Sequence, residues 1–177
     1  MLPLGTPAPT FELLDTVSDN KMSPGQIAAE KATVIMFICN HCPYVKHVQS
    51  ELVKLANDYM AKGIFFVAIS SNDVVNYSDD SPEKMKEVAA EFGYPFPYLY
   101  DESQEVAKAY EAACTPDFYI FDKDLLLVYR GQLDGSRPGN EVPLNGQDIR
   151  KALDHILAGR QVQEIQIPSV GCNIKWK

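Results

Sequence analysis

The 177-residue sequence predicts an α/β fold in which strands and helices alternate. Two apolar, β-branched runs, at 32–38 and 64–70, have the length and composition of buried strands. Residues between them carry apolar side chains at helical spacing, so the unit reads as a crossover between parallel strands. Two further apolar runs flank a polar turn at 122–124 and indicate a β-hairpin, with strands expected at 118–121 and 125–129.

The remaining elements are predicted from their end signals. Residues 11–14 are expected to form a short strand in an N-terminal extension. Ser81 as N-cap, Pro82 in the first turn and Gly93 as stop mark both ends of a helix. Two more helices are expected, at 102–110 and from about 147 to 157. The C-terminal tail is unusually apolar for a chain end, so we expect it to pack back on the rest of the fold.

Length and charge exclude several classes of function. The length fits one domain over residues 1–177, and 16 basic against 24 acidic residues give a net charge of −8. Without a basic run, neither nucleic acid nor an anionic membrane surface is expected as a partner. No apolar stretch is long enough to span a membrane, and the first residues lack a signal-peptide pattern, so a cytoplasmic protein is expected. No cofactor is expected.

The pair Cys39 and Cys42 carries the predicted chemistry. The two thiols stand three residues apart where the strand at 32–38 gives way to the helix, and Pro43 suits the first helical position. Free backbone N–H groups and the helix dipole stabilise a thiolate at Cys42, and a protonated His41 beside it would add to this effect. We therefore expect Cys42 to be the nucleophile and Cys39 to be the first candidate for its resolving thiol.

Other interpretations of the cysteines remain open at this point. A Cys-x-x-Cys pair is also half of a zinc site, which Cys114 and Cys172 could complete, although neither lies in a second such pair. Cys39 and Cys42 could instead be two buried apolar residues, Cys114 could pack as a small core residue, and Cys172 could simply be buried beside Trp176. Cys114 and Cys172 are also possible resolving thiols. Four cysteines are too few for a disulfide-stapled scaffold, which favours catalytic thiols in a reducing cytosol.

Four segments together carry a family resemblance: 37–45, 115–122, 129–133 and 171–176. They resemble the peroxiredoxin-like branch of the alkyl hydroperoxide reductase/thiol-specific antioxidant family, AhpC/TSA, within the thioredoxin superfamily. The resemblance covers nearly the whole chain. It implies a thioredoxin-like fold with an N-terminal extension and a packed tail, and it makes Thr115-Pro116 the cis-proline loop beside the reactive sulfur.

Two departures from the peroxiredoxin pattern decide which activity is expected. Cys39 stands where peroxiredoxins have a Thr or Ser, and their active-site Arg falls near Thr115-Pro116, although Arg130 could replace that cation. A hydroperoxide needs donors on its leaving oxygen. We therefore expect a thiol-disulfide oxidoreductase acting on a protein or small-molecule disulfide, with an external thiol as reductant. A thiol peroxidase acting on hydroperoxides is the alternative, and a zinc- or partner-binding module without turnover is the second alternative.

Overall fold

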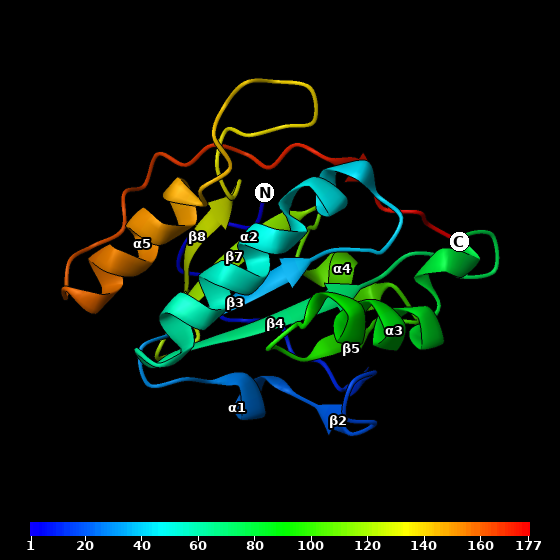
Figure 1. Ribbon diagram of the computed structural model, residues 1–177. Coiled ribbons are helices and arrows are strands. Elements are labelled where there is room, and N and C mark those ends of the chain that lie inside the picture. The colour runs from blue at the N-terminus through cyan, green and yellow to red at the C-terminus, as the bar shows by residue number, and fades with distance from the viewer.

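A seven-stranded mixed sheet lies at the centre of the protein, with helices on both faces (Figure 1). The computed structural model describes residues 1–177. The strands follow the order β2-β1-β5-β4-β3-β7-β8, and β6 and β9 form a separate two-stranded sheet. The strands are β1 (Leu13–Asp15), β2 (Lys21–Met22), β3 (Ala32–Phe37), β4 (Ile64–Ser70), β5 (Tyr98–Tyr100), β6 (Cys114–Thr115), β7 (Asp117–Asp122), β8 (Leu127–Gly131) and β9 (Cys172–Asn173). The helices are α1 (Pro24–Ile27), α2 (Pro43–Met60), the 3₁₀ turn η1 (Ser78–Asp80), α3 (Pro82–Phe92), α4 (Glu105–Ala109) and α5 (Gln147–Leu157).

The centre of the sheet contains the crossover that the sequence predicts. β3 and β4 are parallel, from Ala32 opposite Ile64 to Phe37 opposite Ile69. β7 pairs with the other side of β3 in antiparallel orientation and continues into β8 as a hairpin. Every residue of β3 is buried, which explains its unbroken apolar sequence. The fold is therefore the predicted α/β type, and its class is thioredoxin-like.

Alternate side chains of β3 enter two different cores, because successive residues of a strand point to opposite faces. Val34 and Met36 pack with α2, α3 and α5 on one face. Ile35 and Phe37 pack on the other face with α4 and the N-terminal extension. Each face of the sheet is thus covered, and the end of β3 is held rigidly at the point where the chain turns into α2.

The helix ends agree with their sequence signals. The Ser81 hydroxyl accepts a hydrogen bond from the Lys84 N–H at 3.3 Å, and Gly93 ends α3 with a φ of 65°. α2 begins at Pro43, and α5 spans Gln147–Leu157 as expected. None of the helices is long and apolar enough to span a membrane.

Three expected boundaries were wrong, each for a local reason. The helix expected at 102–110 begins only at Glu105, because Gln104 adopts a φ of 65°. The second hairpin strand begins at Leu127 and not Leu125, whose φ of 57° places it in the turn. The first strand spans Leu13–Asp15, and the carboxylate of Asp15 caps the turn that follows by accepting backbone N–H groups.

The C-terminal tail packs back on the fold, as predicted. In Figure 1 it runs from α5, in orange and then red, over the N-terminal end of α2 to the C-terminus. Its last strand, β9, pairs with β6, and the side chain of Ile174 is fully buried in the second core. The tail therefore passes directly over the segment that carries Cys39 and Cys42.

Substitution of Leu55 tests how much the packing of α2 against the sheet contributes to stability. Its side chain is fully buried between α2 and the sheet. We expect Leu55→Ala to lower the free energy of unfolding by about 2–5 kcal/mol, because it removes buried methyl groups and leaves a cavity. Urea unfolding followed by circular dichroism measures the loss. Val142→Ala, at an exposed loop residue, is the control and should change stability by less than about 0.5 kcal/mol; equal losses in both variants would contradict this packing.

Candidate active site

Cys42 lies at the N-terminal end of α2. It is the N-cap residue, with extended backbone dihedrals, and Pro43 occupies the first helical position as predicted. Its side chain has no solvent exposure. The first N–H groups of a helix lack intrahelical acceptors, so they and the helix dipole favour negative charge at this sulfur. Cys42 is therefore placed where a thiolate is stabilised once its disulfide is reduced.

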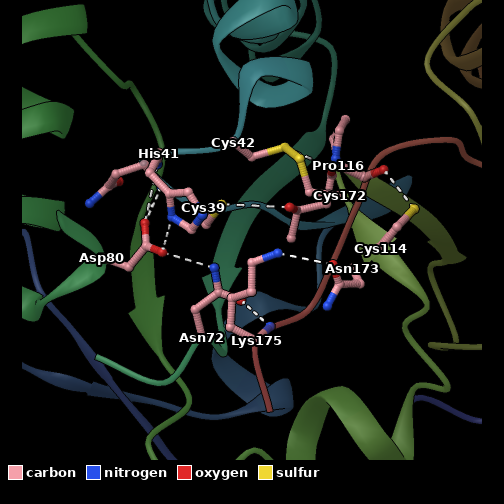
Figure 2. The surroundings of a disulfide bond; sticks show 12 residues. Cys39, His41, Cys42, Asn72, Asp80, Cys114, Pro116, Cys172, Asn173 and Lys175 are labelled. Carbon is pink, nitrogen blue, oxygen red and sulfur yellow. Dashed lines mark hydrogen bonds and ion pairs between the residues drawn. A yellow bond between two sulfur atoms is a disulfide. The ribbon is translucent and has the colours of Figure 1, made fainter. Parts of the chain in front are cut away.

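A disulfide joins Cys42 to Cys172 on β9, 130 residues later (Figure 2). The two Cα atoms are 6.2 Å apart, within the normal range for this bond. The first-choice pairing of Cys42 with Cys39 is not the one formed, and Cys39 and Cys114 are free thiols. The physical reason is the path of the tail, which brings β9 across the end of α2.

The loop Thr115-Pro116 lies against both sulfurs of the Cys-x-x-Cys pair. The Thr115–Pro116 bond is cis, as predicted. Cys42 Sγ lies 3.4 Å from the carbonyl oxygen of Thr115, and Cys39 Sγ lies 3.5 Å from the Thr115 hydroxyl. The resemblance places this loop beside the reactive sulfur, and the structure brings the two together.

The two free thiols have raised pKa values. Burial raises the pKa of Cys114 to about 12, and the carboxylate of Asp117 adds to the shift. Burial also raises the pKa of Cys39, with a further contribution from Asp80. The Cys114 thiol donates to the carbonyl oxygen of Pro116 at 3.6 Å, which suits a neutral S–H group. Both residues are thus poor nucleophiles near neutral pH.

Asp80 is a site residue that the sequence did not reveal. Two consecutive aspartates in a polar loop usually indicate solvated surface, yet the side chain of Asp80 is fully buried. One carboxylate oxygen accepts the backbone N–H groups of Asn40 (2.7 Å) and His41 (3.2 Å), and the other accepts from the Asn72 amide (2.8 Å) and from His41 Nδ1. A carboxylate with four donors is satisfied without solvent, so burial is tolerated.

The His41 ring is held by this carboxylate. Because a carboxylate oxygen accepts hydrogen bonds, Nδ1 of His41 is assigned as the donor in this contact. The ring also stacks on Tyr77, with centroids 5.4 Å apart. A run of two aspartates in a polar loop gives no sequence signal for this contact, because it joins segments 39 residues apart.

Cys39, His41 and Asp80 offer three possible metal-ligand atoms that lie within 4.8 Å of one another. This set differs from the four-cysteine site considered from the sequence. Both oxygens of Asp80 already accept two hydrogen bonds each, and these bonds fix the turn that leads into α2. We therefore interpret Cys39, His41 and Asp80 as part of a hydrogen-bonded turn and not as a metal site.

The arginine that faces the cis-proline loop is Arg137. A small hollow beside Pro116 is lined by Tyr44, Ser169 and Arg137, among others. Arg130, the cation suggested from the sequence, instead donates to the Gln166 side chain at 3.1 Å. The guanidinium of Arg137 is itself bound to the carbonyl oxygens of Asp134 and Ser136, both at 2.7 Å.

Comparison with known proteins identifies the family. Residues 4–130 match the AhpC/TSA family. This match spans well over half of the chain, and the chain therefore belongs to the AhpC/TSA family. The fold is thioredoxin-like, and of the two disulfide-bonded cysteines Cys42, at the start of α2, lies within the matched residues. Cys172 and the rest of the tail lie beyond the matched residues.

Two solved structures cover this whole chain. An uncharacterised conserved protein from Geobacillus kaustophilus is 66% identical, with a TM-score of 0.98 over 94% of its own chain. A hypothetical protein from Sinorhizobium meliloti is 44% identical, with a TM-score of 0.97 over 96% of its chain. The thioredoxin domain of a thiol-disulfide oxidoreductase from Bacteroides vulgatus is 18% identical over 85% of this chain and 98% of its own, with a TM-score of 0.66, which shows the shared fold.

Among curated proteins, the thiol-disulfide oxidoreductase YkuV of Bacillus subtilis is similar. The two are 29% identical over 99 residues, which is 55% of this chain. The match spans 64% of YkuV, less than two thirds of its length.

The raised pKa values predict how the free thiols react with iodoacetamide in reduced protein. The thiolate fraction of a group with raised pKa is small below that pKa and grows about tenfold with each pH unit. We expect Cys114 to be the slowest of the four to react at pH 8 and its rate to keep rising beyond pH 10. Timed alkylation with peptide mapping measures this, and protein unfolded in guanidinium is the control. A plateau for Cys114 near pH 9 in folded protein would contradict the shift.

Asp80→Asn tests the buried carboxylate. The substitution leaves one acceptor oxygen where two are used and turns an amide N–H₂ toward the donors of His41 and Asn72. We expect a loss of about 2–4 kcal/mol in the free energy of unfolding, measured by urea denaturation.

Asp79→Asn is the matched control for this prediction. The side chain of Asp79 is exposed, and only its backbone carbonyl contacts the site, by accepting from the Asn40 amide. A change below about 0.5 kcal/mol is expected. Similar losses in both variants would show that the carboxylate of Asp80 has no special role.

Proposed function

We propose that the protein is a thiol-disulfide oxidoreductase in which Cys42 is the nucleophile and Cys172 the resolving thiol. The observation that carries the proposal is the Cys42–Cys172 disulfide at the N-terminal end of α2, beside the loop Thr115-Pro116. The similarity to YkuV supports the same class of reaction. Pro116 shapes the groove in which the disulfide of a protein or small molecule would approach Cys42.

The proposed cycle conserves atoms and electrons. The Cys42 thiolate attacks one sulfur of the substrate disulfide, and the other sulfur leaves as a thiolate with the electron pair. The Cys172 thiolate then attacks Cys42 Sγ, expels the bound substrate sulfur as a second thiolate, and forms the disulfide seen in the structure. Two external thiols reopen this bond and are themselves oxidised to a disulfide. A reducing compartment such as the cytoplasm would supply them.

This proposal replaces Cys39 as first candidate for the resolving thiol. Cys39 is buried, its pKa is raised, and its sulfur lies against the Thr115 hydroxyl. Cys172 is already within bonding distance of Cys42 and lies on a segment at the surface. Cys39 and Thr115 then serve to pack the floor of the site, and His41 holds the turn through Asp80.

A thiol peroxidase is the second candidate, favoured by membership of the AhpC/TSA family. Cleavage of a hydroperoxide needs preorganised donors at the leaving oxygen, and loss of one such donor costs about a hundredfold in rate. Here a thiol, Cys39, takes the place of the expected hydroxyl. The carbonyl oxygens of Asp134 and Ser136 already hold the guanidinium of Arg137. We therefore favour disulfide exchange.

The two activities are distinguished by the rates of the reduced protein. We expect faster oxidation by a small or protein disulfide than by hydrogen peroxide at equal concentration, measured by stopped-flow fluorescence of Trp176. Cys172→Ser should accumulate a mixed disulfide on Cys42, found by mass spectrometry, because no thiol can expel the substrate. Cys39→Ser is the matched control and should turn over. Accumulation in Cys39→Ser would restore Cys39 as resolver, and much faster oxidation by peroxide would favour the peroxidase.

A further inference from the structure

The tail crosses the active site as an added strand. β9 pairs antiparallel with β6, and Cys172 lies opposite Thr115. This is the way in which an extended peptide adds to a free strand edge, where main-chain hydrogen bonds hold the peptide and pockets set its specificity. The residue opposite Thr115 is also the one whose sulfur is bonded to Cys42. Figure 2 shows the two sulfurs meeting below α2, beside the labelled Pro116.

Gly171 restricts which segments can occupy this edge. A Cβ atom built on Gly171 would overlap the carbonyl oxygen of Thr115 and would lie 2.6 Å from the carbonyl carbon. Both are backbone atoms next to Pro116, so no flexible side chain can move to relieve the overlap. Gly171 is not among the glycines with positive φ. The close approach of two backbones, and not an unusual dihedral angle, is what requires glycine here.

The tail is anchored upstream of Gly171 without help from the disulfide. The Gln132 N–H donates to the carbonyl oxygen of Ile167 at 2.9 Å, and the Ser169 hydroxyl donates to that of Gly131 at 2.6 Å. A Cβ atom on Gly131 would overlap the same Ile167 oxygen. This part of the tail therefore stays in place when the Cys42–Cys172 bond opens.

A second anchor lies downstream of Cys172. The Lys175 N–H donates to Asn72 Oδ1 at 2.8 Å, and the carbonyl oxygen of Lys175 accepts from the Asp73 N–H at 2.8 Å and from the Gln104 amide at 2.9 Å. Held on both sides, the reduced tail remains at a high effective concentration beside the edge of β6. A partner segment must displace it locally to reach Cys42.

We propose that the edge of β6 selects extended segments in which a glycine precedes the reactive cysteine. The protein's own Gly171-Cys172 segment and the cysteine segment of a protein disulfide occupy this edge in turn. The inference rests on the proposed thiol-disulfide exchange and adds the class of substrate: a protein disulfide whose target cysteine follows a glycine in an accessible, extended stretch.

The cycle requires the partner segment and the tail to occupy the edge of β6 one after the other. With the partner segment on the edge, the Cys42 thiolate attacks the sulfur of its glycine-preceded cysteine, and the other partner sulfur leaves as a thiolate. The tail then returns to the edge, and the Cys172 thiolate attacks Cys42 Sγ and expels the partner cysteine as a thiolate. The partner disulfide has gained two electrons, and Cys42 and Cys172 have lost them.

Two peptides of otherwise equal sequence test the selectivity, Ser-Val-Gly-Cys-Asn-Ile and Ser-Val-Ala-Cys-Asn-Ile, each disulfide-bonded to thionitrobenzoate. The protein is the full chain, reduced, with Gly171→Ala and Cys172→Ser, so that its own tail no longer fits or resolves. We expect the glycine peptide to release thionitrobenzoate at least about tenfold faster, after both rates are normalised to those with glutathione. Equal normalised rates would overturn the selectivity.

Cys172→Ser with Gly171 intact tests the exchange at the edge, because its tail still covers β6. The preference for the glycine peptide should shrink severalfold in this variant. Ile165→Ala combined with Cys172→Ser is the matched control for folding, since Ile165 is an exposed tail residue outside the hollow beside Pro116, and it should behave like Cys172→Ser alone. An unchanged preference with the tail in place would overturn the proposed competition.

A final arm separates this inference from the function on which it rests. Free dithiobis(nitrobenzoate) has no peptide backbone that could pair with β6. Its rate therefore reports only the reactivity of Cys42 toward a disulfide. If it reacts rapidly at Cys42 while the two peptides do not differ, disulfide exchange stands and the glycine selectivity fails. If neither it nor the peptides react at Cys42 in the reduced protein, disulfide exchange itself fails.

Discussion

The carbonyl group of Thr115 is the point on which the active site depends. Cys42 Sγ lies 3.4 Å from its oxygen, the backbone of Gly171 packs directly on it, and Cys172 is the strand partner of the same residue. Cys42, Cys172 and the tail are thus all placed relative to one peptide unit. That unit is rigidly placed in turn, because β7 begins at Asp117 and pairs along its whole length with buried β3.

Local signals account for the parts of this arrangement that could be predicted. The run of buried residues in β3, the proline that starts α2 and the capped ends of α3 each depend on neighbours in the chain, and the structure agrees with them. The position of Cys42 at a helix N-terminus was predicted for the same reason, because helix starts leave local signals in the sequence. Two of the three boundaries that failed lie where Gln104 and Leu125 adopt positive φ, which residues of these types seldom do.

Contacts between distant segments could not be predicted in this way. A helix terminus favours a thiolate at Cys42 whichever thiol resolves it, so the spacing of Cys39 alone suggested the wrong disulfide partner. Asp80 looked like solvated surface, because nothing nearby in sequence shows that two backbone N–H groups, an amide and an imidazole converge on it. The apolar composition of the tail did indicate that it packs on the fold. Composition does not show which tail residue pairs with which residue of β6. Gly171, just before Cys172, is a sequence signal for close backbone packing. It could be interpreted only once Thr115 was known to be the residue packed against it.

The same network connects the turn before Cys42 with the tail that carries its partner. Asn72 donates its amide N–H₂ to Asp80 and uses its oxygen to accept the Lys175 N–H. An amide flipped by half a turn would present its oxygen to the carboxylate and its hydrogens to a backbone donor, so only one orientation satisfies both contacts. Asp80 in turn holds the N–H groups of Asn40 and His41. The position of the tail downstream of Cys172 is therefore set by the residues that shape the start of α2.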